Sequence, residues 1–276
     1  MREEIKKELD KRNIFYEETS VKKNGITKEG LVIGNESIRP TIYWENIVYY
    51  GNSVEEIIDK ILELSNEQKM DHLNKDLLLD WNWVKNHIVV CIQKNRNSDS
   101  VYMKFLDMIV YIRILFSYED SYASCIVTHN LLKIWDISIS ELFRTAWINT
   151  KDTFRIYNMV DTILQMMGAD ISDDLHDEIV GYDFDMYILT NQIKYFGAAA
   201  ILNQEFLNSV CDNLNTEEIM ILPSSIHEII ITKNENYSLD EMKDMVISVN
   251  SECLPDEDIL SDHVYIYNRN EEEFYY

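Results

Sequence analysis

The residues of this sequence that could perform chemistry lie closest together between positions 222 and 228. Ser224, Ser225, His227 and Glu228 place two hydroxyls, an imidazole and a carboxylate within five residues. A serine activated by a histidine is a common hydrolase nucleophile, and a carboxylate such as Asp262 would orient the histidine. One hypothesis is therefore a hydrolase with its site near Ser225 and His227.

The same stretch has a structural interpretation. Pro223 and the two serines are typical turn residues. On an ideal strand, alternation places His227 and Glu228 on opposite faces, so the two side chains cannot point into one pocket. The sequence thus favours a turn followed by a structural histidine and assigns no catalytic residue.

Motifs that hold metals, phosphates or cofactors are missing from the sequence. It contains no P-loop, no dinucleotide-binding glycine pattern, no HExxH and no GxSxG elbow. The six histidines are scattered without metal-ligand spacing. We therefore predict no metal site and no cofactor.

Charge is the strongest compositional feature. The chain has 25 basic and 49 acidic residues, a formal net charge of −24. Phosphate contacts need clustered lysine and arginine, so the composition argues against direct binding to nucleic acid or to anionic membranes. An acidic surface instead suits a basic protein partner.

The densest acidic segment runs from 168 to 185. If residues 171–180 are helical, several of its carboxylates fall on one face at three- and four-residue steps, a spacing that could imitate a row of phosphates. The segment could equally be a solvated loop, or a cation cluster without EF-hand spacing. Its acidic residues are Asp170, Asp173, Asp174, Asp177, Glu178, Asp183 and Asp185.

These observations lead to a first functional hypothesis, a non-enzymatic acidic protein that binds a basic partner. Its strong form is a nucleic-acid mimic that inhibits a bacterial defence nuclease, as anti-CRISPR proteins do. The hydrolase is one alternative. Another is a self-associating structural or regulatory module, which an exposed aromatic group would indicate. The aromatic residues concerned are Trp44, Tyr49, Tyr50, Trp81 and Trp83.

Targeting signals and cysteines indicate the compartment. The apolar run 108–116 is interrupted by Arg113 and is far shorter than the roughly 20 residues of a membrane span. The charged start of the chain does not resemble a secretory signal. No two of the four cysteines form a CxxC pair, which favours buried thiols over disulfides or zinc ligands. We predict a cytoplasmic protein.

Hydrophobic periodicity predicts an α+β fold, with antiparallel or mixed sheets and helices packed on one face. The chain is expected to form a single domain, 1–276, of one or two lobes, with any internal seam near 94–100. A hairpin is expected around Asn24-Gly25, and Ser53 is expected to cap a helix. Expected helices are 2–11, 54–66, 138–150, 153–167, 205–214 and 239–250. Expected strands are 14–22, 26–33, 40–44, 87–93, 102–116, 124–130, 186–190, 198–202, 219–222, 226–232 and 264–267.

Four segments carry a family resemblance. They are Tyr187-Ile-Leu-Thr-Asn191, Phe196-Gly-Ala-Ala-Ala200, Ile221-Leu-Pro-Ser-Ser-Ile-His-Glu228 and Leu260-Ser-Asp-His-Val-Tyr265. With them, the sequence resembles a domain-of-unknown-function family found mainly in clostridial bacteria. The resemblance implies one unit over nearly the whole chain and a bacterial source, with a mobile element as one origin. It implies no activity.

Overall fold

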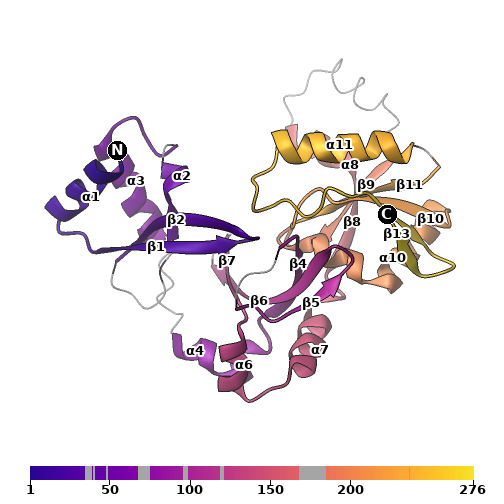
Figure 1. The fold of residues 1–276 in the computed structure, drawn as a ribbon, viewed down its shortest axis with the longest axis horizontal. Helices are drawn as coiled ribbons and strands as arrows, with labels where there is room; N and C mark the ends of the chain where they lie inside the picture. The colour runs from indigo at the N-terminus through magenta and orange to yellow at the C-terminus, as the bar shows by residue number, and fades with distance from the viewer. Residues whose placement is uncertain are drawn as a thin grey trace.

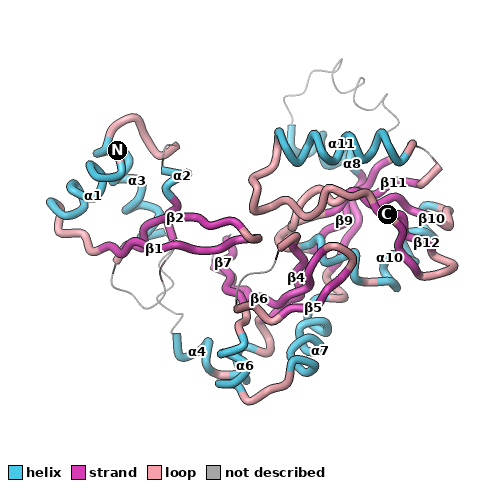
Figure 2. The backbone as a smooth tube through the Cα atoms, viewed as in Figure 1, coloured by secondary structure: helices cyan, strands magenta, loops and turns pink. Residues whose placement is uncertain are grey.

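The computed structural model describes residues 1–34, 39, 41–47, 49–67, 75–95, 99–118, 121–167, 185–235 and 237–276. Within them the chain forms three antiparallel sheets with helices around them, so the predicted α+β class is confirmed (Figures 1 and 2). We call the first sheet and its helices the lobe, and the other two sheets with their helices the body. No helix among the described residues is long and apolar enough to cross a membrane.

The lobe is built around the predicted hairpin. Asn24 and Gly25 form its two-residue turn, both with positive φ (45° and 86°), the conformation that such turns need. Ile5, Leu9 and Ile58 are fully buried between the helices and this sheet. The elements are α1 (Arg2–Lys11), β1 (Tyr16–Lys23), β2 (Ile26–Ile33), β3 (Thr41–Tyr43), α2 (Trp44–Ile47) and α3 (Val54–Glu67).

The middle sheet is organised by one long strand, β6 (Met108–Tyr118). It pairs with β4 (Ile88–Gln93) along one edge, and with β5 (Tyr102–Phe105) and then β7 (Ser121–Ile126) along the other. Lys94 and Asn95, the start of the expected seam, directly follow β4. The surrounding helices are α4 (Lys75–Leu79), α5 (Trp81–Val84), α6 (His129–Trp135) and α7 (Ile139–Thr150).

The third sheet has six strands in the order β13-β12-β10-β11-β9-β8. Its strands alternate between two cores: Ile219 and Ile221 face η1 and α10, whereas Met220 faces α11. This sheet therefore carries helices on both faces, where one face was expected. The elements are β8 (Phe154–Asn158), α8 (Met159–Met167), β9 (Met186–Asn191), η1 (Gly197–Leu202), α10 (Gln204–Leu214), β10 (Glu218–Leu222), β11 (Ile229–Lys233), α11 (Leu239–Glu252), β12 (Tyr265–Asn268) and β13 (Glu273–Tyr275).

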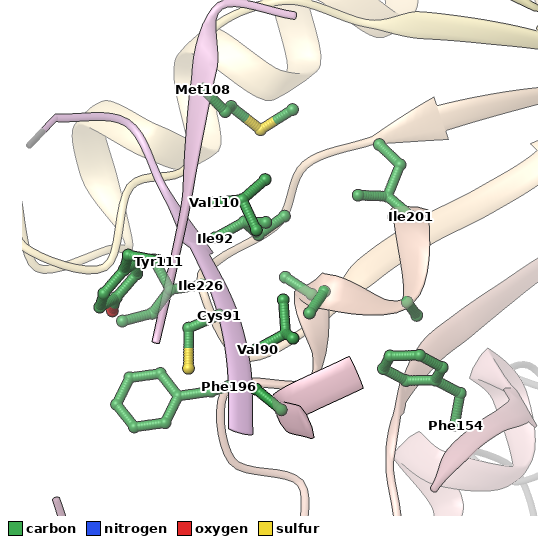
Figure 3. Packing of buried hydrophobic residues seen from close by; sticks show 14 of the residues in the cluster. Val90, Cys91, Ile92, Met108, Val110, Tyr111, Phe154, Phe196, Ile201 and Ile226 are labelled. Atoms are coloured by element: carbon green, nitrogen blue, oxygen red, sulfur yellow. The ribbon is translucent and has the colours of Figure 1, made fainter. Parts of the chain in front are cut away.

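The two sheets of the body share one hydrophobic core. Figure 3 shows Cys91 of β4 and Tyr111 of β6 beside Phe196 and Ile226, which come from loops of the third sheet. Cys91 and Tyr111 are at most 1% exposed. These contacts fix the loops at 195–196 and 226–227 against the middle sheet.

Several expected elements differ in the structure. Residues 198–202, expected as a strand, form with Gly197 the 3-10 helix η1. Residues 154–158, expected as helix, pair with β9. The expected strand 102–116 is broken at Leu106, which has a φ of 52° in the turn between β5 and β6. The end of the expected strand 124–130 belongs to helix α6, which Thr128 caps.

The tip of the hairpin joins the lobe to the body (Figure 1). The Asn24 amide donates to the carbonyl oxygens of Glu257 (3.1 Å) and Ile259 (2.7 Å), and its side-chain oxygen accepts from the Asn95 backbone (2.7 Å). Lys28 forms an ion pair with Glu257. The loop at 257–259 is thereby held on one side by the lobe.

Candidate functional site

A cleft of about 740 Å³ opens where the lobe meets the body. The hairpin tip and β3 form one wall, and β6 and β7 form the second. The third wall consists of the loops at 195–196, 226–227 and 257–258. Its size falls in the usual range of small-molecule sites.

The lining of this cleft is cationic although the chain is acidic. Four basic side chains and two carboxylates line it, which gives a local charge of +2 (four minus two, His227 taken as neutral), against −24 for the whole chain. The charged residues are Lys22, Lys23, Arg39, Arg113, Glu257 and Asp258. Positive charge is therefore concentrated in this hollow.

Arg113 lies on β6, partly buried at the floor of the cleft. Its Nε donates to Ser124 Oγ (2.9 Å) and an Nη donates to the Ser124 carbonyl (3.3 Å). The guanidinium stacks over the Phe196 ring at 4.8 Å. Among the residues that the structure describes, no carboxylate forms an ion pair with it. The Tyr111 hydroxyl is a further partner of the guanidinium. The five N–H groups of Arg113 exceed the acceptors that Ser124 and Tyr111 supply, so donors remain for a ligand.

Lys23, at the end of β1, brings a second cation to the cleft from the lobe. Its ammonium lies 4.4 Å from the centre of the Tyr43 ring, and no carboxylate in the described part of the chain forms an ion pair with it. Burial lowers the pKa of Lys23; the carboxylate of Glu257 opposes this, and the positive charges of Lys28 and Arg113 add to it. Two partly buried cations without a carboxylate partner therefore face the same space.

His227 lies in the third wall, in the loop before β11. Its Nδ1 accepts a hydrogen bond from the Phe196 backbone N–H (3.2 Å), so in the neutral ring the proton is on Nε2. Nε2 lies 3.9 Å from Asp258 Oδ1. The ring stacks against Tyr195 at 5.1 Å. The contacts of both nitrogens fix the orientation and tautomer of the imidazole.

These contacts predict a pH effect on stability. Burial lowers the pKa of His227, against the charge of Asp258, so on acidification the unfolded chain takes up this proton first. The free energy of unfolding should fall as the pH drops below about 6.5, the ordinary pKa of histidine. His227→Gln should lose less stability between pH 7 and pH 5 in urea unfolding than the wild type. Burial raises the pKa of Asp258, which has the opposite effect on stability, and the charge of His227 limits that rise. His227→Gln removes this charge, so both changes reduce the loss of stability on acidification. Equal losses would contradict this account.

The residues predicted from sequence as a hydrolase site have other contacts. Ser225 is buried, and its Oγ accepts from the backbone N–H of His227 (3.1 Å) rather than from the ring. Asp262 accepts from Lys94 Nζ (2.5 Å) and from the Asn250 amide (2.9 Å). The carboxylate beside His227 is that of Asp258. Ser224, partly exposed, lies in the same turn.

The acidic and aromatic predictions fall partly outside the described residues. Of the segment 168–185, the structure describes only Asp185, which pairs with Lys233 (3.4 Å). Asp170, Asp173, Asp174, Asp177, Glu178 and Asp183 lie outside the described residues.

Among the aromatic residues, Tyr49 is 85% exposed and Trp44 only 7%, while Tyr50, Trp81 and Trp83 are partly buried. All four cysteines are free: Cys91 and Cys211 are buried, Cys125 is partly buried and Cys253 is exposed.

Sequence reasoning missed Lys23, Arg113 and Asp258 as site residues. Arg113 left one signal, because it interrupts an otherwise apolar strand. Asp258 and Lys23 left none, since they meet the cleft only through the contact between the lobe and the body.

The sequence matches the family of unknown function DUF5688 over residues 1–269. The chain belongs to this family. No curated protein and no solved structure matches it. The match includes the lobe and nearly all of the body, so every wall of the cleft lies within the part of the chain that defines the family.

Gly197 supports the third wall by its lack of a side chain. A Cβ there would lie 2.2 Å from Thr190 Oγ1 and 2.8 Å from the His227 carbonyl oxygen. We expect Gly197→Ala to destabilise the protein by about 1–3 kcal/mol or more and to displace the His227 turn. Urea unfolding measures the loss. The control Ala198→Gly, in the same helix, should cost about 1–2 kcal/mol through backbone entropy and the loss of a buried methyl group, and should leave the His227 signal unchanged. A stable Gly197→Ala protein with an unchanged His227 signal in NMR would contradict this.

Proposed function

We propose that this chain is a non-enzymatic binding protein whose cleft receives an anionic group of a ligand at Arg113. The observation that carries the proposal is the guanidinium of Arg113, which lies in a partly buried cleft and which no described carboxylate neutralises. A ligand anion would supply the missing partner.

The free-energy cost of an unpaired, partly buried charge supports an anion-binding role for Arg113. A charge removed from water without a partner destabilises a fold, and proteins normally pair or expose such groups. A hydrogen bond to a charged group contributes about 1.5–3 kcal/mol, so an anion at Arg113 would both bind and stabilise the protein. Sites that bind ligands commonly retain such unfavourable features in the free protein.

The geometry of His227 favours binding over catalysis. A general base needs a free lone pair within reach of the substrate. The lone pair on Nδ1 accepts the Phe196 N–H, and Nε2 with its proton faces Asp258. In this arrangement the imidazole has no free acceptor, so it serves to shape the wall.

The earlier hypotheses stay predictions. An acidic surface that binds a basic partner, including a nuclease-inhibiting nucleic-acid mimic, is still consistent with the charge of −24. Six of the seven carboxylates in the predicted acidic patch of residues 168–185 lie outside the described residues. Ligand binding in the cleft is a separate function, because the lining of the cleft is positively charged whereas the predicted partner-binding surface is acidic.

Thermal unfolding in the presence of different anions tests the proposal. Phenyl phosphate, benzoate, inorganic phosphate and acetate are compared with chloride at one ionic strength. At least one of the four should raise the melting temperature of the wild type, since a ligand that binds the folded state stabilises it. Arg113→Met should remove the increase. The control Arg155→Met makes the same charge change on β8, at an arginine that pairs with no described carboxylate, and should keep it. No increase with any anion, or equal increases in all three proteins, would refute the proposal.

A further inference from the structure

We infer that the bound group is the dianion of an organic phosphate monoester, held between Arg113 of the body and Lys23 of the lobe. This inference rests on the proposed function and adds the chemical class of the ligand. Three features support it: the number of unpaired cations, their types, and the apolar walls around them.

The number of partly buried, unpaired cations in the cleft favours a ligand with two negative charges. Two other charged residues of the lining are already paired: Arg39 with Glu17 (2.8 Å) and Glu257 with Lys28. Lys22, Lys23 and Arg113 have no such partner in the described part of the chain. Lys22 is exposed to water, so Lys23 and Arg113 are the two partly buried cations that remain unpaired. A phosphate monoester carries about −1.5 to −2 at pH 7 and can neutralise both, whereas a carboxylate carries a single charge.

The types of the two cations suit a phosphate. Arginine offers a planar fork of donors that matches two phosphate oxygens, and lysine binds a third oxygen as a point charge. The two approach from different sides, because Lys23 comes from the hairpin tip and Arg113 from β6 (Figure 1). Both side chains line the same cleft.

The rest of the cleft indicates an organic ligand. At about 740 Å³ the space is much larger than a phosphate ion. Leu78, Phe116 and Ile126 add apolar surface to the walls. Small-molecule sites typically combine such apolar walls with a few polar groups that fix the orientation of the ligand. We therefore assign the polar end of the cleft to the phosphate and the apolar walls to its organic substituent.

Calorimetric titration at pH 7.5 with phenyl phosphate, benzoate and inorganic phosphate tests the inference on the full chain. We expect phenyl phosphate to bind about tenfold or more tightly than either of the others, the scale of one additional charge-assisted contact. Lys23→Met should weaken phenyl phosphate about tenfold and benzoate much less. The control Lys104→Met removes an exposed lysine on β5, outside the lining of the cleft, and should retain the preference.

The outcomes separate this inference from the proposed function. If none of the three probes binds, both fail. If benzoate binds as tightly as phenyl phosphate, or if Lys23→Met behaves like Lys104→Met, the dianion assignment fails and the anion-binding cleft stands. If inorganic phosphate binds as tightly as phenyl phosphate, the assignment of the apolar walls to an organic substituent is wrong. Affinity for phenyl phosphate should also fall below about pH 6, where a phosphate monoester takes up its second proton, more steeply than affinity for benzoate.

Discussion

Arg113→Met is expected to weaken phenyl phosphate binding by about 10- to 150-fold, the equivalent of one to two hydrogen bonds to a charged group. It should do so without destabilising the free protein by more than about 1 kcal/mol. Replacing a charge that has no described carboxylate partner with an apolar side chain of similar length removes an unfavourable desolvation, which offsets the lost contacts to Ser124. Calorimetry measures the first effect, and urea unfolding without ligand measures the second.

This pairing of effects distinguishes a ligand-binding arginine from a structural one. If Arg113 mainly held β7 through Ser124, its removal would lower stability and affinity together. Arg155→Met, which also loses contacts to backbone carbonyls, is the matched control and should keep full affinity. A large loss of stability in ligand-free Arg113→Met would contradict our interpretation of the site.

Asn24→Ala is expected to destabilise the contact between the lobe and the body by about 2–4 kcal/mol. The substitution removes three hydrogen bonds, each contributing about 0.5–1.5 kcal/mol, and leaves two carbonyls and one N–H without these partners. Because Lys23 precedes Asn24, phosphate affinity should fall as well. Hydrogen exchange of β1 and β2, with urea unfolding, measures the loss.

Asn13→Ala is the control for this change. Asn13 also has a positive φ (53°), but its side chain makes no hydrogen bond within the described residues. Alanine therefore introduces similar backbone strain at both positions, and only at position 24 does it remove the contacts between lobe and body. Equal effects of the two substitutions would show that the tip contacts contribute little.

Local sequence patterns predicted much of the fold. Asn24-Gly25 specified the hairpin turn. Ser238 and Glu241 form a complete capping box at α11, which the periodicity had located. Patterns failed where tertiary packing decides the structure. About a third of the helix expected over 153–167 is strand, because β9 offers residues 154–158 a pairing partner that no local signal shows.

The candidate site was less predictable than the fold. His227 was visible because its neighbours form a recognisable turn, but its carboxylate partner is Asp258, not Asp262. The cleft exists because the hairpin tip reaches a loop 233 residues further along the chain. No periodicity or motif encodes a contact of that kind, so Lys23 and Arg113 could be assigned to one site only in the structure.

The most direct test of the anion-binding cleft is a crystal structure of the protein with phenyl phosphate. We predict a phosphate within hydrogen-bond distance of the Arg113 guanidinium, with the Lys23 ammonium on its other side and the phenyl ring against the apolar wall. A saturated crystal with an empty cleft, or with the phosphate bound only elsewhere, would contradict the account.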